Sequence, residues 1–205
     1  MNRISNLHTR GAKMNREEWL HQGYKELGNS VFKLVNVELP DDVKVSCGWA
    51  SSGGASRNQT TIGQCFARRV SDSKVNEIFI SPKLDDPIHV LDVLAHELIH
   101  AFDDCKSGHR GQFKRVAVAI GLEGKMTSTH AGEVLKEKLQ AIAQKIGEYP
   151  HAKLDYTKQL KKQSTRMIKV SCNECEFSYR TSQKNIDNME NKTCNCCGEW
   201  AMEAC

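Results

Sequence analysis

The chain has 205 residues, of which 39% are hydrophobic and 26% charged, and its formal net charge is +4. This length accommodates one domain with a substantial core plus a small second one, because domains commonly have ~100 to 200 residues. The composition is ordinary for a globular protein and contains no apolar run long enough to cross a membrane, so no membrane partner is expected. The first residues lack the apolar core of a signal peptide, which predicts a cytoplasmic protein.

The N-terminal half begins with a predicted flexible arm over residues 1–14. From Asn15 to about Val35 apolar residues recur at helical spacing and predict a first helix. Three short runs rich in β-branched and aromatic residues follow and predict a small antiparallel sheet; they read VKVSCGW, TTIGQCFA and NEIFISPKL. The last of these is either an exposed edge, along which a peptide substrate adds as a strand, or a buried interior strand.

Three more helices are expected before residue 150. Asp86 and Pro87 mark the start of one that runs to about Asp104, because proline suits the first helical turn. A second begins near His109 and stops at Gly121, and a third covers residues 129–147. Together the elements predict an α+β domain over residues 15–150.

The helix that begins at Pro87 contains the sequence HELIH. Its apolar residues form one stripe at helical spacing: Leu91, Leu94, Ala95, Leu98, Ile99 and Phe102. His96 and His100 lie off that stripe and, being four residues apart, project from the same side of the helix. Glu97 lies about 100° round the helix, where a carboxylate can take a proton from an attacking water without being a ligand. The pattern predicts a catalytic zinc ion with Glu97 as general base.

A catalytic zinc ion needs a third protein ligand, and His109 is the first choice. Ser107 and Gly108 can turn the chain after the helix and return His109 to the metal. Glu123 is the second choice, and His130 and His89 are further alternatives behind it. Asp103 and Asp104 are either hydrogen-bond partners of the ligand histidines or simply solvated carboxylates.

A basic segment over residues 151–170 separates this domain from a cysteine-rich end, with six Lys or Arg against one Asp. It is either a solvated linker or a contact with nucleic acid. The candidate nucleic-acid ligands, five in this segment and two in the cysteine-rich end, are Lys158, Lys161, Lys162, Arg166, Lys169, Arg180 and Lys184.

The end of the chain, residues 171–205, contains two C-x2-C pairs that predict a closed structural zinc site in a zinc ribbon. The expected ligands are Cys172, Cys175, Cys194 and Cys197. Cys196 competes with Cys197 for the fourth place, and Gly198 favours Cys197 because it permits a tight turn. The thiols outside the ribbon are expected to be ordinary buried groups; they are Cys47, Cys65 and Cys105.

HELIH followed by GHRGQFK, a basic segment and a zinc ribbon resembles the SprT-like (Spartan-related) zinc metalloprotease family, especially its small bacterial and phage members. The resemblance extends from about residue 15 to residue 200 and is most specific over 86–113. It implies a minimal gluzincin-like α+β fold with a C-terminal zinc ribbon. It also implies one catalytic zinc ion at His96, His100 and His109, with Glu97 as the catalytic glutamate, and one structural zinc ion at the ribbon cysteines.

The function implied by this resemblance is zinc-dependent endopeptidase activity on DNA-bound or DNA-crosslinked protein, near the nucleoid. Its partners would be a protein substrate and DNA, single-stranded or structured. The alternative is a non-proteolytic zinc-binding protein associated with DNA or transcription. A third reading is a general peptidase in which the ribbon only stabilises the chain.

Overall fold

The computed structural model describes residues 14–55, 60–159, 167–189, 193–194, 196–198 and 201–203. The chain divides into two compact units, residues 1–159 and 160–205. Almost all of the predicted N-terminal arm lies outside the described residues. Within the described ranges, every helix is too short or too polar to span a membrane.

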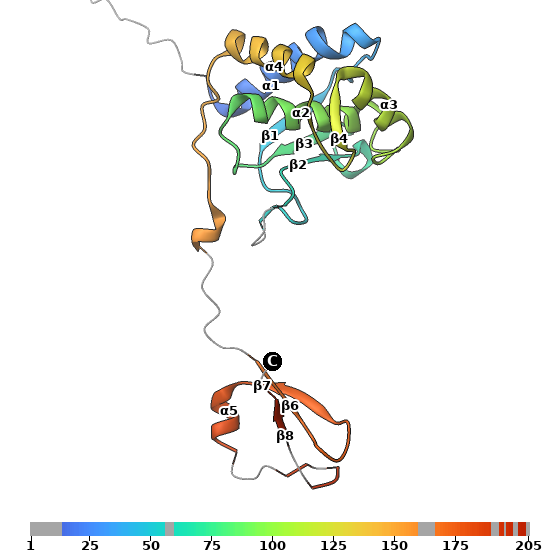
Figure 1. The fold of residues 1–205 in the computed structure, drawn as a ribbon. Helices are drawn as coiled ribbons and strands as arrows, with labels where there is room; N and C mark the ends of the chain where they lie inside the picture. The colour runs from blue at the N-terminus through green and yellow to red at the C-terminus, as the bar shows by residue number, and fades with distance from the viewer. Residues whose placement is uncertain are drawn as a thin grey trace, which may run out of the picture. The chain divides into compact units, whose positions relative to one another are not determined.

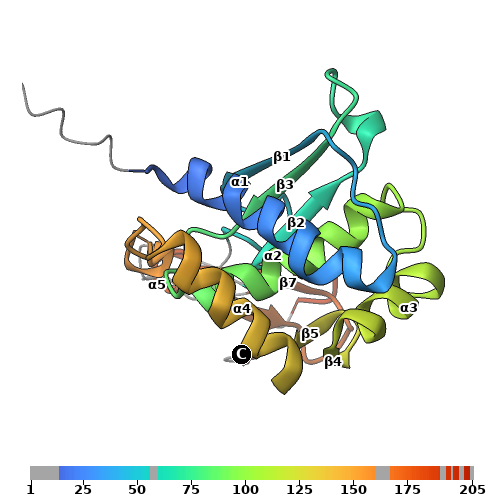
Figure 2. The same ribbon diagram turned by 90° about the horizontal axis from the view of Figure 1, so that it is seen from above.

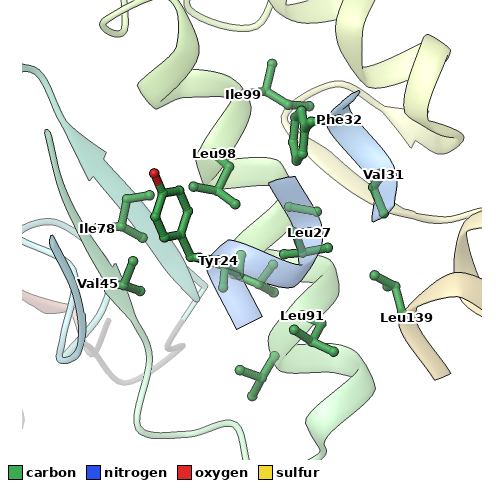
Figure 3. Packing of buried hydrophobic residues seen from close by; sticks show 14 of the residues in the cluster. Tyr24, Leu27, Val31, Phe32, Val45, Ile78, Leu91, Leu98, Ile99 and Leu139 are labelled. Atoms are coloured by element: carbon green, nitrogen blue, oxygen red, sulfur yellow. The ribbon is translucent and has the colours of Figure 1, made fainter. Parts of the chain in front are cut away.

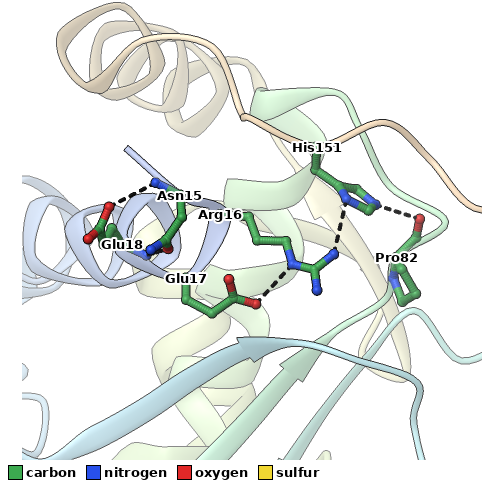
Figure 4. A network of polar contacts seen from close by, with 6 residues as sticks. All are labelled: Asn15, Arg16, Glu17, Glu18, Pro82 and His151. Carbon is green, nitrogen blue, oxygen red and sulfur yellow. Dashed lines mark hydrogen bonds and ion pairs between the residues drawn. The ribbon is translucent and has the colours of Figure 1, made fainter. Parts of the chain in front are cut away.

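The first helix, α1, covers Arg16–Leu27. Its start is held by a capping box, in which the Asn15 side chain accepts a hydrogen bond from the Glu18 amide and the Glu18 carboxylate accepts one from the Asn15 amide (Figure 4). The chain continues through a π-helical turn at 28–32 and a 3-10 turn at 33–35, and ends at Asn36 with φ of 56°. The predicted extent of this helix, to about Val35, is therefore confirmed.

The three predicted strands form one sheet with the order β1-β3-β2. They are β1 (Val43–Cys47), β2 (Gly63–Phe66) and β3 (Asn76–Ile80). β2 pairs antiparallel with β3, but β1 pairs parallel with it, so the prediction of a purely antiparallel sheet is wrong for β1. The reason lies in the path of the chain. After β1 it crosses to the opposite edge of the sheet, where it forms β2, and β3 then returns between β1 and β2. β3 is thus the interior strand, and β1 and β2 are the two edge strands.

The helix α2 (Pro87–Phe102) lies at the centre of the first unit. Asp86 caps its start by accepting a hydrogen bond from the His89 amide at 2.7 Å. Figures 1 and 2 show α1, α2 and α4 (Glu133–Ile146) on the same side of the sheet. Because α2 packs against strands and helices, it is apolar on most of its faces. Figure 3 shows this core, to which α1, α2, α4, β1 and β3 all contribute.

The region after α2 differs from the prediction. α3 covers Gly111–Ile120, and a hairpin follows, made of β4 (Leu122–Lys125) and β5 (Ser128–Ala131). α4 then covers Glu133–Ile146, so the predicted helix over 129–147 begins four residues too early. Residues 129–131 pair with β4 because their backbone hydrogen bonds are made across the hairpin, and the helix can start only after Gly132.

The predicted basic linker crosses the boundary between the units. His151 lies against the first unit, where its Nε2 donates to the Pro82 carbonyl at 2.9 Å (Figure 4). That tautomer leaves Nδ1 free to accept from Arg16 Nη1, 3.4 Å away. The Leu154 amide also donates to Pro82 O, at 2.7 Å. Residues 151–159 therefore belong to the first unit rather than to a free linker.

The second unit contains a sheet of order β7-β6-β8 and the short helix α5 (Gln183–Asp187). Its strands are β6 (Ile168–Ser171), β7 (Ser178–Thr181) and β8 (Ala201–Glu203). Among the described residues, its buried apolar side chains are chiefly Val170 and Ile186. So small a core needs another source of stability, and metal binding is the usual one in units of this size.

Candidate metal centres

The three histidines predicted as ligands come together at one point. His109 Nε2 lies 3.3 Å from His96 Nε2 and 3.3 Å from His100 Nε2. His96 and His100 are one turn apart on α2, and His109 is brought back by the turn between α2 and α3. These nitrogens form a group that can hold a metal ion.

The chemistry of this donor set fits a cation. Each Nε2 has one lone pair in the plane of its ring, and a single proton on His109 can satisfy only one of its two close neighbours. A cation between the nitrogens satisfies all three lone pairs. Burial and the neighbouring imidazoles lower the pKa of His96 to about 3 and that of His100 to about 4. Both rings are therefore neutral at pH 7, which is the form that binds metal.

Thr129 on β5 sets the tautomer of His96. Its Oγ1 lies 2.8 Å from His96 Nδ1. If Nε2 keeps its lone pair for a metal, Nδ1 carries the hydrogen and donates it to Thr129, as outer partners of ligand histidines commonly accept. A second hydrogen bond joins α2 to β5, because the Asp92 carboxylate on α2 accepts from the Ala131 amide on β5. The sequence reasoning missed Thr129; the β-branched Thr127 and Thr129, alternating along this stretch, were its one available signal.

Phe113, in the first turn of α3, lies against all three imidazoles. Its ring centroid is 4.9 Å from that of His96, 4.4 Å from that of His100 and 5.0 Å from that of His109. The side chain is fully buried. It therefore supplies an apolar support that fixes the orientation of the three rings, and it too was not singled out from the sequence.

Glu97 is buried beside this group and points toward β2. Its carboxylate accepts a hydrogen bond from the Cys65 amide, and burial raises its pKa to about 8. Gly63 makes room for it, because a Cβ at that position would lie 2.5 Å from Glu97 Oε1. A nearby divalent cation would favour the ionised carboxylate and so oppose the effect of burial.

The turn that carries His109 is fixed by a polar network that is anchored in the core at Asn76. Asp104 Oδ1 accepts hydrogen bonds from the Arg68 amide at 2.8 Å and from Asn76 Nδ2 at 3.2 Å. Asn76 is fully buried on β3, and its Oδ1 accepts from Arg68 Nε at 3.2 Å. Asp103 Oδ2 accepts from the Ser107 amide at 3.0 Å. Both aspartates thus order the turn, and these bonds go to backbone and amide groups rather than to the ligand histidines.

The alternative third ligands lie elsewhere. Glu123 and His130 face each other across the exposed β4–β5 hairpin, with 4.0 Å between Glu123 Oε2 and His130 Nε2. His89 is exposed in the first turn of α2. None of these three side chains belongs to the histidine group, in which His109 takes the third place.

The histidine group opens into a pocket of about 420 Å³. One wall is β2 with the residues before it, and another is the tip of the β4–β5 hairpin, over residues 127–129. Glu97 and all three histidines line the pocket. A reacting group in this pocket would therefore meet the metal-binding nitrogens and the carboxylate together.

The second group that can hold a metal ion is made of the four predicted ribbon cysteines. Cys172 Sγ lies 2.9 Å from Cys197 Sγ, and Cys175 Sγ lies 3.8 Å from Cys194 Sγ. Cys196 is exposed and stands outside the group; its amide donates to Cys194 Sγ at 3.3 Å. Gly198 has φ of 98°, and its amide donates to the Cys194 carbonyl at 2.8 Å, which forms the expected tight turn.

The predicted nucleic-acid ligands are divided between the units. Lys158 is exposed in the first unit, 3.9 Å from Asp155. Lys169 and Arg180 are directly opposite each other on β6 and β7, and Lys184 is exposed on α5. The remaining three, Lys161, Lys162 and Arg166, lie outside the described residues.

Comparison with known proteins adds no family to this description. No protein-family model matches the chain, and neither the curated proteins nor the solved structures include one that is significantly similar to it.

Proposed function

We propose that the first unit is a zinc-dependent endopeptidase of the SprT-like, gluzincin-like type, and that the chain acts on DNA-bound or DNA-crosslinked protein. The observation that carries the proposal is the convergence of three neutral imidazoles beside the buried carboxylate of Glu97 in one open pocket. Three nitrogen ligands with a fourth position open to the pocket are the arrangement of catalytic zinc sites. The four-cysteine group of the second unit fits a closed structural zinc site.

When bound, zinc would polarise the scissile carbonyl and acidify a water molecule. Glu97 accepts the proton of the attacking water at its carboxylate and then donates it to the leaving amine. The Cys65 amide donates a hydrogen bond to that carboxylate, and Gly63, which has no side chain, leaves room for it. Thr129 and Phe113 fix the rings of the ligand histidines, so that the nitrogens need not reorganise during the reaction.

The substrate is proposed to lie along β2. This strand is one of the two edges of its sheet, and it is the edge that forms a wall of the pocket next to Glu97. An extended peptide can pair with an outer strand through main-chain hydrogen bonds, which gives affinity for many sequences. This mode suits an enzyme that must cleave diverse proteins, and it transfers to β2 the role considered for β3.

The test is cleavage of a DNA-crosslinked protein, and of the same protein free, by the zinc-loaded chain with and without single-stranded DNA. Glu97→Gln should lower the rate by about 10² to 10⁴, the usual contribution of a general base, while zinc content stays unchanged. Glu123→Gln is the matched control, because it removes an exposed carboxylate outside the pocket. If the wild type holds zinc at both sites and cleaves neither protein, the peptidase proposal is wrong and a zinc-binding protein associated with DNA takes its place.

The association with DNA is supported by Lys169 and Arg180 in the second unit. They are directly opposed on neighbouring strands, where two like charges repel each other. Glu203 on β8 is opposite Lys169 on its other side, and a further anion beside Lys169 and Arg180 would reduce their repulsion. A phosphodiester backbone would supply that anion. Lys184 on α5 and the basic stretch that precedes β6 in the sequence extend the positive charge.

This part of the proposal is tested by the salt dependence of DNA binding by the full chain. Lys169→Gln together with Arg180→Gln should reduce the slope of log K against log [salt] by about two, one for each lost phosphate contact. Lys33→Gln together with Lys136→Gln removes two exposed charges from the first unit and is the control. An equal reduction in both double variants would show that only net charge matters and would reject a specific contact at β6 and β7.

A further inference from the structure

We propose that Cys65 and Cys105 form a redox-modification site in the wall of the pocket, where a hydroperoxide converts the two thiols into a reversible disulfide. Neither residue has a part in metal binding as described above. The proposal goes beyond the peptidase function, because the modification itself can be detected whether or not the chain cleaves peptides.

The two cysteines come from different elements and meet beside Glu97. Cys65 lies on β2 two residues after Gly63, so both face α2, and Cys105 lies in the turn that follows α2. The Cys105 thiol donates a hydrogen bond to the Cys65 carbonyl oxygen at 3.6 Å, and the Cys65 thiol donates one to the Phe66 carbonyl oxygen at 3.8 Å. Forty residues of chain thus separate two cysteines that the fold brings together in the wall of one pocket.

The turn holds Cys105 in a defined position. Cys105 has φ of 59° and the preceding Asp104 has φ of 55°, a left-handed conformation that only tight local bonding retains in residues other than glycine. The bonds are present: the Cys105 amide donates to the His100 carbonyl at 2.8 Å, and Asp104 is held by Asn76 and Arg68. The position of the Cys105 thiol beside Cys65 is therefore a fixed feature of the turn.

Access and selectivity also favour this pair. Cys65 and Cys105 are both half-buried and both line the pocket, so a small oxidant can reach them. Cys47, the other half-buried thiol of the first unit, lies near Tyr149 and lines none of the pocket. Four cysteines of the second unit are grouped for metal binding, in which each thiolate would be a ligand; they are Cys172, Cys175, Cys194 and Cys197.

The chemistry balances with one equivalent of hydroperoxide. One thiol attacks the outer peroxide oxygen, gives a sulfenic acid and releases an alcohol, or water when the oxidant is hydrogen peroxide. The second thiol then attacks that sulfur, and the disulfide forms with release of water. Two cysteines lose two electrons and two protons in all, and a dithiol restores them by exchange.

The disulfide would join the substrate-binding strand to the turn that carries His109. Cys65 donates its amide hydrogen to Glu97, so a pull on Cys65 alters the position of that carboxylate. We therefore expect oxidation to lower peptidase activity at least tenfold, with recovery after treatment with a dithiol. This consequence rests on the proposed function, whereas the formation of the disulfide does not.

The experiment treats the zinc-loaded full chain with hydrogen peroxide, blocks free thiols with iodoacetamide and digests with trypsin. Cleavage at Lys and Arg places Cys65 alone in peptide 58–68 and Cys105 alone in peptide 84–106. The expected product is these two peptides joined by a disulfide, absent after dithiol treatment and absent from Cys105→Ser. Cys47 falls alone in peptide 45–57 and serves as the internal control, which should remain alkylated.

If the joined peptide does not form, or if Cys47 is oxidised at the same rate, the proposal is overturned. Cys65→Ser, checked for folding by circular dichroism, must also abolish the joined peptide, and its failure to do so would overturn the pairing. For each variant that is active, the activity of the oxidised protein is divided by that of the reduced protein, and this ratio is compared with the ratio for Cys47→Ser. A joined peptide with unchanged activity would reject the effect on catalysis alone, and an inactive wild type that still forms it would reject only the peptidase function.

Discussion

Asp104 Oδ1 accepts a hydrogen bond from the fully buried side chain of Asn76, and this bond ties the turn leading to His109 to the central strand of the sheet. Asp104→Ala should therefore loosen the turn that places His109 and lower zinc affinity at the histidine group by about tenfold, the lower end of the range for losing a group that supports a metal ligand. Asp104→Asn retains an Oδ1 acceptor and is the control. Competition with a chromogenic chelator measures both. Equal affinities for the Ala variant and the wild type would show that the turn holds His109 without this bond.

Thr129→Val should weaken metal binding through His96. Valine keeps the shape of threonine but cannot accept the hydrogen from Nδ1, so the imidazole loses its fixed tautomer. We expect zinc affinity to fall by about 10-fold to 100-fold. Thr129→Ser, which keeps the hydroxyl, should stay near the wild-type value. A fall of the same size in the serine variant would point to packing of the hairpin as the cause.

Gly63→Ala should abolish activity at a modest cost in stability. The added Cβ would lie 2.5 Å from Glu97 Oε1 and 2.6 Å from Val93 Cγ1, so the carboxylate must leave its position. Overpacking of this kind destabilises by about 1 to 3 kcal/mol. Gly28→Ala places the same group 3.7 Å from its nearest neighbour, Leu39 Cδ1, and is the control. The measurements are peptidase rate and urea unfolding, and an active Gly63→Ala protein would contradict the proposed place of Glu97.

Glu97→Gln should stabilise the metal-free protein increasingly as pH rises. The pKa of Glu97 is about 8 in the folded metal-free chain against an ordinary value of 4.5, so between these values the folded state binds more protons than the unfolded one. Its contribution to stability is therefore complete below about pH 4.5 and is lost as pH rises toward 8. Glutamine does not titrate, and His96 and His100 remain in both proteins.

The measurement for this prediction is the free energy of unfolding of both proteins in the presence of a chelator. The difference, variant minus wild type, should grow between about pH 5 and about pH 8. With zinc added, the difference at the higher pH should shrink, because a cation favours the ionised carboxylate. A difference that does not change with pH would show that Glu97 is solvated in the metal-free chain.

Cys172→Ser should unfold the second unit and leave the first intact. The group that can hold a metal in the second unit loses one of its four sulfurs, and so small a core has little else to stabilise it. Zinc content should fall from two ions per chain to one, a stoichiometry that elemental analysis measures. Cys196→Ser changes an exposed neighbour outside the group and should keep both ions. Loss of both ions from Cys172→Ser would mean that the two sites depend on each other.

How much of this the sequence could predict depends on how local each feature is. The helix with His96, Glu97 and His100 follows from periodicity within one element, and its predicted end is within two residues of the observed one. The fourth cysteine could be chosen because Gly198 follows it directly and takes the left-handed conformation that the turn requires.

Features that depend on strand order could not be predicted in the same way. Asn76 and Asp104 are 28 residues apart, and nothing in either neighbourhood indicates that β3 enters the sheet between β1 and β2. Thr129 falls in the predicted helix over 129–147 because the polar residues before α4 resemble a helix start, while its pairing with Gly124 is made across a hairpin. The meeting of Cys65 and Cys105 likewise requires the placement of β2 against the end of α2.

Phe113 has a further consequence for the exchange of metal. Its ring closes the inner side of the three imidazoles and lies outside the pocket lining, so an ion reaches the nitrogens from the side that receives a peptide. The metal ion and the peptide therefore enter through the same opening of the pocket. A bound peptide will slow the escape of metal to a chelator, and the exchange rate of the metal becomes a gauge of pocket occupancy that requires no cleavage at all.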